Sequence, residues 1–309
     1  MATPVLIDTD MGVDGAVAVS LALATEALDV RAVVGVAGCV PLNQAVSNVS
    51  RFLSELKPPV MPGVGLGLEQ SGAGLRDRRE VYGNDGLGNW NQPVPASIAP
   101  EHFESVYESF LKKAGDEAVI FALGPLTNIA AVIEGAPELM KKIQRLVIAG
   151  GVVWTRGNVS EHIEFNFHRD PVAASRVLSS GLPITVVPLD VTSLVCLDQS
   201  HVAHLAASGY RTGQLPAKLL EHAVEYDGEP VYGKIFLPAA VALGSFIWPG
   251  LFMKTRMELQ VTPDGKEAGR ARPALAHDKS KQVDLLTAVN TVDFLENMLE
   301  ALCHEAFVV

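Results

Sequence analysis

A short apolar run that ends among aspartates constrains the fold of this chain more than any other stretch. Val5–Ile7 predicts a buried strand, and Asp8, Asp10 and Asp14 follow it closely. A second apolar run, at residues 16–24, predicts a helix. A strand, a turn and a helix in this order begin a βα unit. Sites in open α/β sheets lie beyond the carboxyl ends of strands, so this acidic turn is a candidate for chemistry.

The aspartates allow a chemical and a structural interpretation. Carboxylates this close together repel one another unless a cation or a shared proton lies among them. On the structural interpretation, Asp14 caps the following helix, and Asp8 and Asp10 are solvated turn residues. The segments further along the chain favour the chemical interpretation.

The same order of apolar strand, polar or glycine-rich turn and helix recurs along the chain. Further strands are predicted at residues 28–38, 118–123, 143–149 and 183–187. Strands that alternate with helices indicate a parallel sheet with helices on both faces. The predicted fold class is therefore α/β, with a mainly parallel central sheet flanked by helices (Rossmann-like), and we expect one domain over residues 1–309.

The remaining segments complete the prediction. Helices are expected at residues 42–56, 101–113, 128–133, 201–207, 215–226 and 238–247, and short strands at 257–261 and 283–289. Asn290 or Thr291 is expected to cap a final helix that ends near Leu302. Residues 57–98 are rich in glycine and proline, which predicts a long functional loop region.

One uncharged run needs separate treatment because of its length. Residues 236–253 carry no charge and reach the length of a minimal membrane span. Prolines and glycines interrupt the run, which favours a buried core helix that ends near Trp248.

The composition argues against several classes of partner. The net charge is −11 and the basic residues are scattered, so neither nucleic acids nor anionic membranes are expected partners. Cys39, Cys196 and Cys303 are widely spaced and form no CxxC pattern, which predicts neither a disulfide framework nor a zinc site. A cytoplasmic location is the expected one, and no signal peptide is visible.

Several short motifs, each weak alone, occur in a fixed order along nearly the whole chain. They are Asp8-Thr9-Asp10-Met11-Gly12-Val13-Asp14, Gly124-Pro125-Leu126-Thr127-Asn128, Gly150-Gly151, Gly157-Asn158, Glu164-Phe165-Asn166, Asp170-Pro171 and Leu189-Asp190-Val191-Thr192. In this order they resemble the inosine/uridine-preferring nucleoside hydrolases. The resemblance implies hydrolysis of the N-glycosidic bond of a ribonucleoside or related ribosyl compound, a bound calcium ion, and a homo-oligomer.

The resemblance also implies roles for individual residues. Asp10 is then a metal ligand and the general base, and the backbone carbonyl of Leu123 is a further metal ligand. The metal holds both the water and the ribose diol, and a metal-bound water loses its proton more readily. Carboxylates near an oxocarbenium-like transition state stabilise its developing positive charge.

Four further side chains are implied to hold the sugar. Asp14 and Asn166 would bind ribose hydroxyls, and Asn158 and Glu164 would hold the 5′-hydroxyl end. The structural alternatives are a helix cap for Asp14, a solvated surface charge for Glu164, and turn-stabilising hydrogen bonds for the two asparagines.

Five positions depart from the family's pattern. The family has a second aspartate directly after the one that matches Asp14, and here that position is Gly15. A His-Asp pair before a proline is replaced by Phe236 and Leu237. The family's asparagine after the second strand corresponds to Cys39, and a loop histidine corresponds to Tyr82.

These departures remove ligands for calcium, which takes about six to eight oxygen ligands, largely from carboxylates. Of the carboxylates that the family supplies, only Asp10 remains, and Leu237 cannot bind a hard cation. We therefore expect that this chain does not hold calcium in the family manner. The loss of the histidine at Phe236 also removes a proton donor to the departing base, so a base that needs little protonation, or a different leaving group, is expected.

Three outcomes stay open at this point. The protein is a catalytically silent relative that binds ribose or a nucleoside, or an enzyme that works without the metal, with the pKa of Asp10 raised by Asp8 and Asp14. In the third outcome a cation of the protein, for which Lys234 is a candidate, replaces calcium. His162 and His168 are expected at the surface or behind the site. The prediction is a ribosyl N-glycosidase with an altered metal site, and the silent binder is the alternative.

Overall fold

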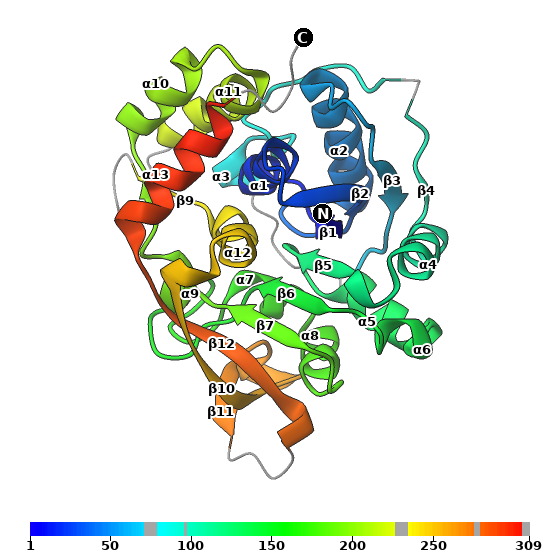
Figure 1. The fold of residues 1–309 in the computed structure, drawn as a ribbon. Coiled ribbons are helices and arrows are strands. Elements are labelled where there is room, and N and C mark those ends of the chain that lie inside the picture. Colours follow the sequence, from blue (N-terminus) through cyan, green and yellow to red (C-terminus); the bar gives the residue numbers. More distant parts are fainter. Residues whose placement is uncertain (71–78, 96–97, 226–233, 275–278, 305–309) are drawn as a thin grey trace.

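In the part of the chain that the structure describes, ten strands form a twisted sheet through the middle of the protein (Figure 1). The computed structural model describes all residues except 71–78, 96–97, 226–233, 275–278 and 305–309. The strands of the sheet are β1 (Thr3–Thr9), β2 (Leu28–Gly35), β3 (Gly63–Leu66), β4 (Glu101–His102), β5 (Val119–Ala122), β6 (Arg145–Ala149), β7 (Ile184–Val187), β10 (Phe252–Val261), β11 (Ala271–Ala274) and β12 (Gln282–Val289). Their order across the sheet is β11-β10-β12-β7-β6-β5-β1-β2-β3-β4.

The sheet is mainly parallel, which confirms the predicted fold class. Among the described residues of this sheet, only the pairs that β10 makes with β11 and β12 are antiparallel. The chain runs outward from β1 to β2, β3 and β4 and then returns to β5 on the other side of β1. The strand order therefore reverses between β1 and β5, and ligands in such sheets bind beyond the carboxyl ends of the strands at this point.

Helices cover both faces of the sheet, because successive side chains of a strand point to opposite faces. Val5 and Ile7 of β1 belong to one apolar cluster, and Leu6 between them belongs to the other. The first cluster is completed by α1 (Val13–Ala24), α2 (Leu42–Leu56), α11 (Arg211–Glu225), α12 (Pro238–Ile247) and α13 (Thr291–Leu302). The second is completed by α4 (Phe103–Ala114), α5 (Thr127–Gly135), α6 (Pro137–Met140) and α8 (Pro171–Leu178), which lie across the sheet from α1 and α12 in Figure 1.

The described residues also form four further helices and a small second sheet. The helices are α3 (Arg79–Tyr82), α7 (Phe165–Arg169), α9 (Leu189–Thr192) and α10 (Gln199–Ala207). β8 (Cys196–Leu197) and β9 (Ile235–Phe236) pair antiparallel as the second sheet.

The uncharged run at residues 236–253 contains the predicted core helix. α12 has the predicted bounds, Pro238–Ile247, and the side chains of its centre are fully buried against α1 and the sheet. Among the residues that the structure describes, no helix is long and apolar enough to cross a membrane.

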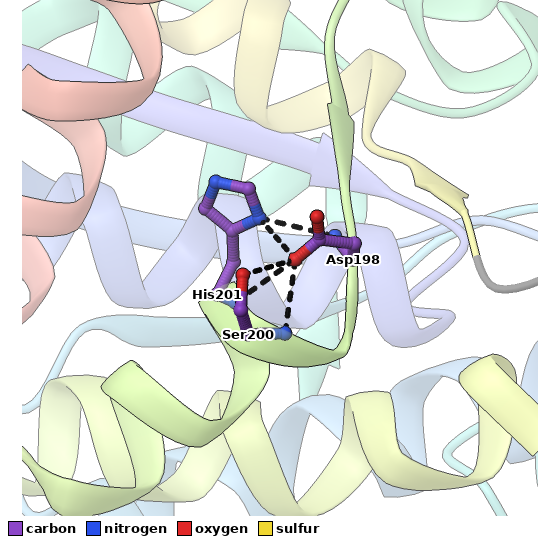
Figure 2. A network of polar contacts seen from close by, with 3 residues as sticks. All are labelled: Asp198, Ser200 and His201. Carbon is purple, nitrogen blue, oxygen red and sulfur yellow. Dashed lines mark hydrogen bonds and ion pairs between the residues drawn. The ribbon is translucent and has the colours of Figure 1, made fainter.

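Side-chain caps fix the starts of two C-terminal helices. Figure 2 shows the capping box of α10, in which Asp198 Oδ1 accepts hydrogen bonds from the Ser200 N–H (2.9 Å) and the His201 N–H (3.2 Å). Hydrogen bonds from the Ser200 hydroxyl and the His201 backbone lower the pKa of Asp198 to about 2. At α13 the cap is Asn290 rather than Thr291, since Asn290 Oδ1 accepts from the Asp293 N–H.

Some boundaries differ from the prediction. Residues 57–98 were expected to be loop but contain β3, which pairs with β2, and α3. β2 ends at Gly35 rather than 38, and β10 begins at Phe252 rather than 257, where pairing with β12 supports it. α11 begins at Arg211 and is described to Glu225, and the predicted end at residue 226 lies outside the described residues.

A buried aspartate ties β1 to the helices on one face of the sheet. Asp8 is fully buried, and its Oδ2 accepts hydrogen bonds from the Tyr107 hydroxyl (2.7 Å) and from Asn128 Nδ2 (2.8 Å). Asn128 Oδ1 in turn accepts from the Leu68 N–H at 2.8 Å. Burial raises the pKa of Asp8 to about 7, although both donors oppose the rise. Asp8 is thus a structural residue, and not the solvated turn residue considered above.

Replacing Asn128 by alanine is expected to lower the free energy of unfolding by about 2 to 3 kcal/mol, because Asp8 and the Leu68 N–H each lose a buried partner. Urea denaturation measures the change. Asn43→Ala is the matched control, since Asn43 lies exposed in the first turn of α2. Equal stability of the Asn128 variant and the control would contradict this account of the network.

Candidate active site at the carboxyl end of β1

The turn after β1 is held in a strained conformation. Met11 is fully buried and has a φ of 43°, in the left-handed region that residues other than glycine rarely adopt. Thr9 Oγ1 accepts a hydrogen bond from the Met11 N–H (3.0 Å), and Asn48 Nδ2 donates to the Met11 carbonyl (3.1 Å). Such conformations persist where neighbours over-determine them, and they cluster at functional sites.

Asp10 lies in this turn and is bound by the loop after β2. Asp10 Oδ2 accepts a hydrogen bond from the Cys39 N–H at 2.7 Å, and the Cys39 thiol lies 3.3 Å from the Asp10 carbonyl. A Cβ at Gly38 would collide with the Asp10 carboxylate, and one at Gly124 would lie 2.9 Å from the Asp10 nitrogen. Glycine is therefore required where these strand ends meet.

Burial is the main cause of the raised pKa of Asp10. The hydrogen bond from the Cys39 N–H and the positive charge of Arg169 oppose this rise. The sequence-based hypothesis attributed the raised pKa of Asp10 to the charges of Asp8 and Asp14. In the structure the charge of Asp10 instead contributes to the raised pKa values of Asp8 and Asp14.

Asp14 joins α1 to α12. It is half-buried in the first turn of α1, and it accepts hydrogen bonds from the Ala239 N–H (2.7 Å) and the Ala240 N–H (3.3 Å) at the start of α12. The N-cap of α1 is Gly12, so the interpretation of Asp14 as the cap of its own helix is wrong. Burial raises the pKa of Asp14 to about 7, and the α12 amides oppose the rise.

Asn166 lies at the carboxyl ends of β5, the neighbour of β1, and of β6, the next strand in the sheet. Its Nδ2 donates to the carbonyl of Ala149, which ends β6, at 2.9 Å, and to that of Leu123, just after β5, at 3.3 Å. The structure thus brings together Asn166 and the Leu123 carbonyl, two groups that the resemblance names separately, and the amide of Asn166 donates to this carbonyl.

Glu164 is almost fully buried and caps α7, so the interpretation of Glu164 as a solvated surface charge is wrong. Its carboxylate accepts hydrogen bonds from the N–H groups of Gly151 (2.8 Å), Asn166 (2.8 Å) and Phe167 (3.1 Å). Asn158 is exposed, and its Oδ1 accepts from the Phe165 N–H at 2.9 Å, a turn-stabilising hydrogen bond of the kind considered above. Both residues therefore position α7.

The residues at the five positions that depart from the family pattern are apolar or small, apart from the hydroxyl of Tyr82. Leu237 is 1% exposed and belongs to the main core, and Phe236 is half-buried in β9. Cys39 is buried, and Tyr82 packs against its cluster. A Cβ at Gly15 would lie 2.5 Å from Thr9 Oγ1.

These residues do not fit a calcium ion held in the family manner. Asp14 is bound by main-chain N–H groups of α12, and Leu237 offers no ligand oxygen. Among the described residues, no group of three or more His, Cys, Asp or Glu side chains is placed to hold a metal ion. Calcium takes about six to eight oxygen ligands, largely from carboxylates, and Gly15 and Leu237 supply none of those that the resemblance implies at their positions.

The positively charged residue that acts on Asp10 is not the one that the sequence suggested. Lys234 is exposed just before β9, whereas the cation whose charge acts on Asp10 is Arg169, which sequence reasoning missed. The only signal for Arg169 was its place directly before the Asp170-Pro171 motif. His162 is exposed, and His168 Nδ1 lies 3.1 Å from the Ala268 carbonyl, away from the strand ends, as expected.

Two acidic residues organise loops beside the site. Asp190 accepts hydrogen bonds from the N–H groups of residues 153–155 in the loop after β6. Asp85 accepts from three N–H groups of residues 87–91, and the Asp85 carbonyl binds Asn48, the residue that also holds Met11. The glycine-rich loop that the sequence indicated is thereby fixed against the β1–α1 turn.

Comparison with known proteins identifies the family. The family model of the inosine-uridine preferring nucleoside hydrolases matches residues 5–296. This chain belongs to that family. The family resemblance of the sequence motifs is thus confirmed.

Members of the family with curated functions or solved structures extend the comparison. A pyrimidine-specific ribonucleoside hydrolase, RihA from Salmonella schwarzengrund (strain CVM19633), is 32% identical over 270 residues, which are 86% of each chain. A plant nucleoside hydrolase, the PpNRh1 enzyme, superposes with a TM-score of 0.92 at 26% identity and covers 98% of this chain and 99% of its own. A purine-preferring ribonucleoside hydrolase from Gardnerella vaginalis gives 0.90 at 25% identity, with 98% and 99% covered.

Replacing Glu164 by alanine is expected to lower the free energy of unfolding by about 2 to 3 kcal/mol, because buried N–H groups lose their acceptor. Thermal and urea denaturation measure the loss. Glu161→Ala in the same loop is the control, since Glu161 is exposed. A Glu164 variant as stable as the control would show that the carboxylate does not hold α7.

Proposed function

We propose that this protein hydrolyses the N-glycosidic bond of ribonucleosides or related ribosyl compounds, with a site that works without calcium. The observation that carries the proposal is the placement of Asp10. A buried carboxylate with a raised pKa lies in a strained turn where the strand order of the sheet reverses, in a chain of the nucleoside hydrolase family. A raised pKa brings a carboxylate closer to the value that suits a general base near neutral pH.

Asp10 acts as the base toward a water molecule. The water oxygen forms a bond to C1′ of the ribose while its proton passes to Asp10. The bond between C1′ and the base nitrogen breaks, and its electron pair leaves with the base. The transition state resembles an oxocarbenium ion, so the carboxylates of Asp10 and Asp14 stabilise its positive charge.

The sugar is held from two directions. Asp14 and Asn166 bind ribose hydroxyls, and Asn158 and Glu164 lie at the 5′ end, as the resemblance implies. In support, Asn166 is fixed on the strand ends of β5 and β6, and Glu164 caps the helix that carries it. The carboxylate of Glu164 is committed to main-chain N–H groups, so its contribution is to position α7.

Phe236 gives the departing base no proton, because a phenyl ring has no acidic hydrogen. The proton that Asp10 takes from water is available to the base after bond cleavage. Leaving groups that tolerate a negative charge are therefore favoured. Relatives of this chain are named for pyrimidine and for purine nucleosides, so both classes belong in the test.

The decisive experiment measures hydrolysis of uridine, cytidine, inosine and an aryl riboside with a good leaving group, each with added calcium and with chelator. We expect turnover that is equal in calcium and in chelator, and fastest on the aryl riboside. Loss of activity in chelator would contradict the metal-independent site.

A catalytically silent binder is the second candidate, and the loss of metal-binding side chains at Gly15 and Leu237 favours it. The same experiment separates the two functions. Measurable binding of a nucleoside by calorimetry without turnover of any substrate would support the binder and reject the enzyme.

Replacing Asp10 by asparagine is expected to lower kcat/KM about 10²–10⁴-fold, because the water loses its proton acceptor. The shape of the side chain and its hydrogen bond to Cys39 are largely kept. Asp116→Asn, at an exposed position, is the control. An Asp10→Asn variant with full activity would remove Asp10 from the mechanism.

We also propose a cytoplasmic location and a homo-oligomeric state. Three unpaired cysteines, Cys39, Cys196 and Cys303, support a reducing compartment. Light scattering during size-exclusion chromatography tests the oligomeric state.

A further inference from the structure

A cavity of about 320 Å³ is lined by residues to which the proposed function assigns no role. Its walls come from two segments of the chain. One is the loop after β6, with residues 152–155 and His162, and the other is the segment at the start of β11, residues 270–273. The volume lies at the lower end of the range of about 300–1,000 Å³ that is usual for small-molecule sites, so the cavity suits a small ligand.

Two guanidinium groups make one wall of the cavity positive. Arg270 Nη1 and Arg272 Nη2 donate to the two carboxylate oxygens of Glu267, the second at 2.6 Å. Two positive charges thus face one negative charge, in a chain whose net charge is −11. A guanidinium has five N–H donors, and the hydrogen bond to Glu267 uses one donor of each arginine. The pair can therefore offer further donors to an oxyanion.

Main-chain hydrogen bonds fix the segment that carries both arginines. The Thr262 N–H donates to the Arg270 carbonyl at 3.0 Å, and Arg272 lies opposite Gln260 in the antiparallel pair of β10 and β11. Residues two apart in an extended segment point to the same side, which agrees with the contact of both guanidinium groups with one carboxylate. Donors that are held in place in this way lose little freedom when a ligand binds.

The loop after β6 contributes a flat aromatic surface. The side chain of Trp154 is 59% exposed, although it lines the cavity. Its main chain is fixed, since the N–H groups of Val153, Trp154 and Thr155 all donate to the carboxylate of Asp190, at 2.6 to 2.8 Å. An exposed indole on a fixed backbone is suited to stack against a flat ring.

We propose that this cavity binds a small molecule that carries both a phosphate group and a flat ring, as a nucleoside monophosphate does. The phosphate binds Arg270 and Arg272, because guanidinium groups form paired, charge-assisted hydrogen bonds with phosphate oxygens. The ring stacks on Trp154, and the Thr155 hydroxyl and the His162 imidazole are further hydrogen-bonding groups of the lining. The site goes beyond the proposed function and does not depend on it, because none of its residues belongs to the sugar-binding set.

The first experiment measures binding to the wild-type protein by calorimetry, with uridine 5′-monophosphate, phenyl phosphate and inorganic phosphate as probes. Phenyl phosphate has a ring and a phosphate but no ribose, so the sugar-binding residues cannot account for its binding. We expect each of the two ring-bearing probes to bind at least about 10-fold more tightly than inorganic phosphate, because stacking adds to the affinity. If either probe binds no more tightly than inorganic phosphate, the proposal is wrong.

The second experiment locates the bound phenyl phosphate with variants of exposed residues. Arg272→Met is expected to weaken binding about 10-fold or more, because a charge-assisted hydrogen bond is lost. Trp154→Ala is expected to weaken it about 5–100-fold, whereas Trp154→Phe keeps a flat ring and most of the affinity. Unchanged affinity in Arg272→Met or in Trp154→Ala would place the probe elsewhere and overturn the proposal.

Two controls test the role of charge. Arg176→Met removes an exposed arginine of α8 that pairs with Glu134, and it should leave the affinity unchanged. Rising sodium chloride concentration should weaken the binding of phenyl phosphate, since the side chains of Arg270 and Arg272 are 25% and 49% exposed and salt screens their charges. An affinity that does not change with salt, or a loss in Arg176→Met as large as that in Arg272→Met, would reject binding by the guanidinium pair.

The same measurements separate this proposal from the proposed function. A protein that binds phenyl phosphate at Trp154 and Arg272 but neither binds nor hydrolyses any nucleoside would support this site and reject the proposed function. A protein that hydrolyses nucleosides but does not bind phenyl phosphate would support the proposed function and reject this site.

Discussion

The hydrogen bond between the Cys39 N–H and the Asp10 carboxylate joins the end of the central strand β1 to the loop after β2. It forms only because glycine at position 38 lets the backbone approach a carboxylate that a Cβ would displace. Gly124 does the same from the β5 side. The end of β1, the loop after β2 and the end of β5 therefore meet around one acidic group.

The fold was largely predictable because its strands and helices carry local patterns. Apolar runs and end signals predicted the first βα unit and α12 with its bounds at Pro238 and Ile247. They narrowed the cap of the final helix to Asn290 or Thr291, and the structure selects Asn290. β3 was missed because half of Gly63–Leu66 is glycine, and pairing with β2, not propensity, makes it a strand. β11 contains a proline, which is tolerated because β11 is at the edge of the sheet.

The site was less predictable because its contacts join segments far apart in the sequence. The resemblance named Asp10 and Asn166 as site residues. In the structure Asp10 follows the carboxyl end of β1, and Asn166 binds carbonyls at the carboxyl ends of β5 and β6. The sequence held no sign that Asp14 binds the amides of α12, that Glu164 is buried under α7, or that Arg169 rather than Lys234 acts on Asp10. Each of these contacts depends on tertiary packing between segments far apart in the sequence, so local sequence patterns do not reveal it.

The contact between Asp14 and Ala239 has a consequence for the order of assembly. Its partners are 225 residues apart, so α1 and α12 are separated by most of the elements of the sheet. Contacts of such sequence separation form late, since closing a long loop has a large entropic cost. During synthesis, β1 and α1 leave the ribosome long before α12 is made. Each new molecule therefore gains the contact between Asp14 and α12 only after α12 has been made, and a chain truncated before α12 would lack it.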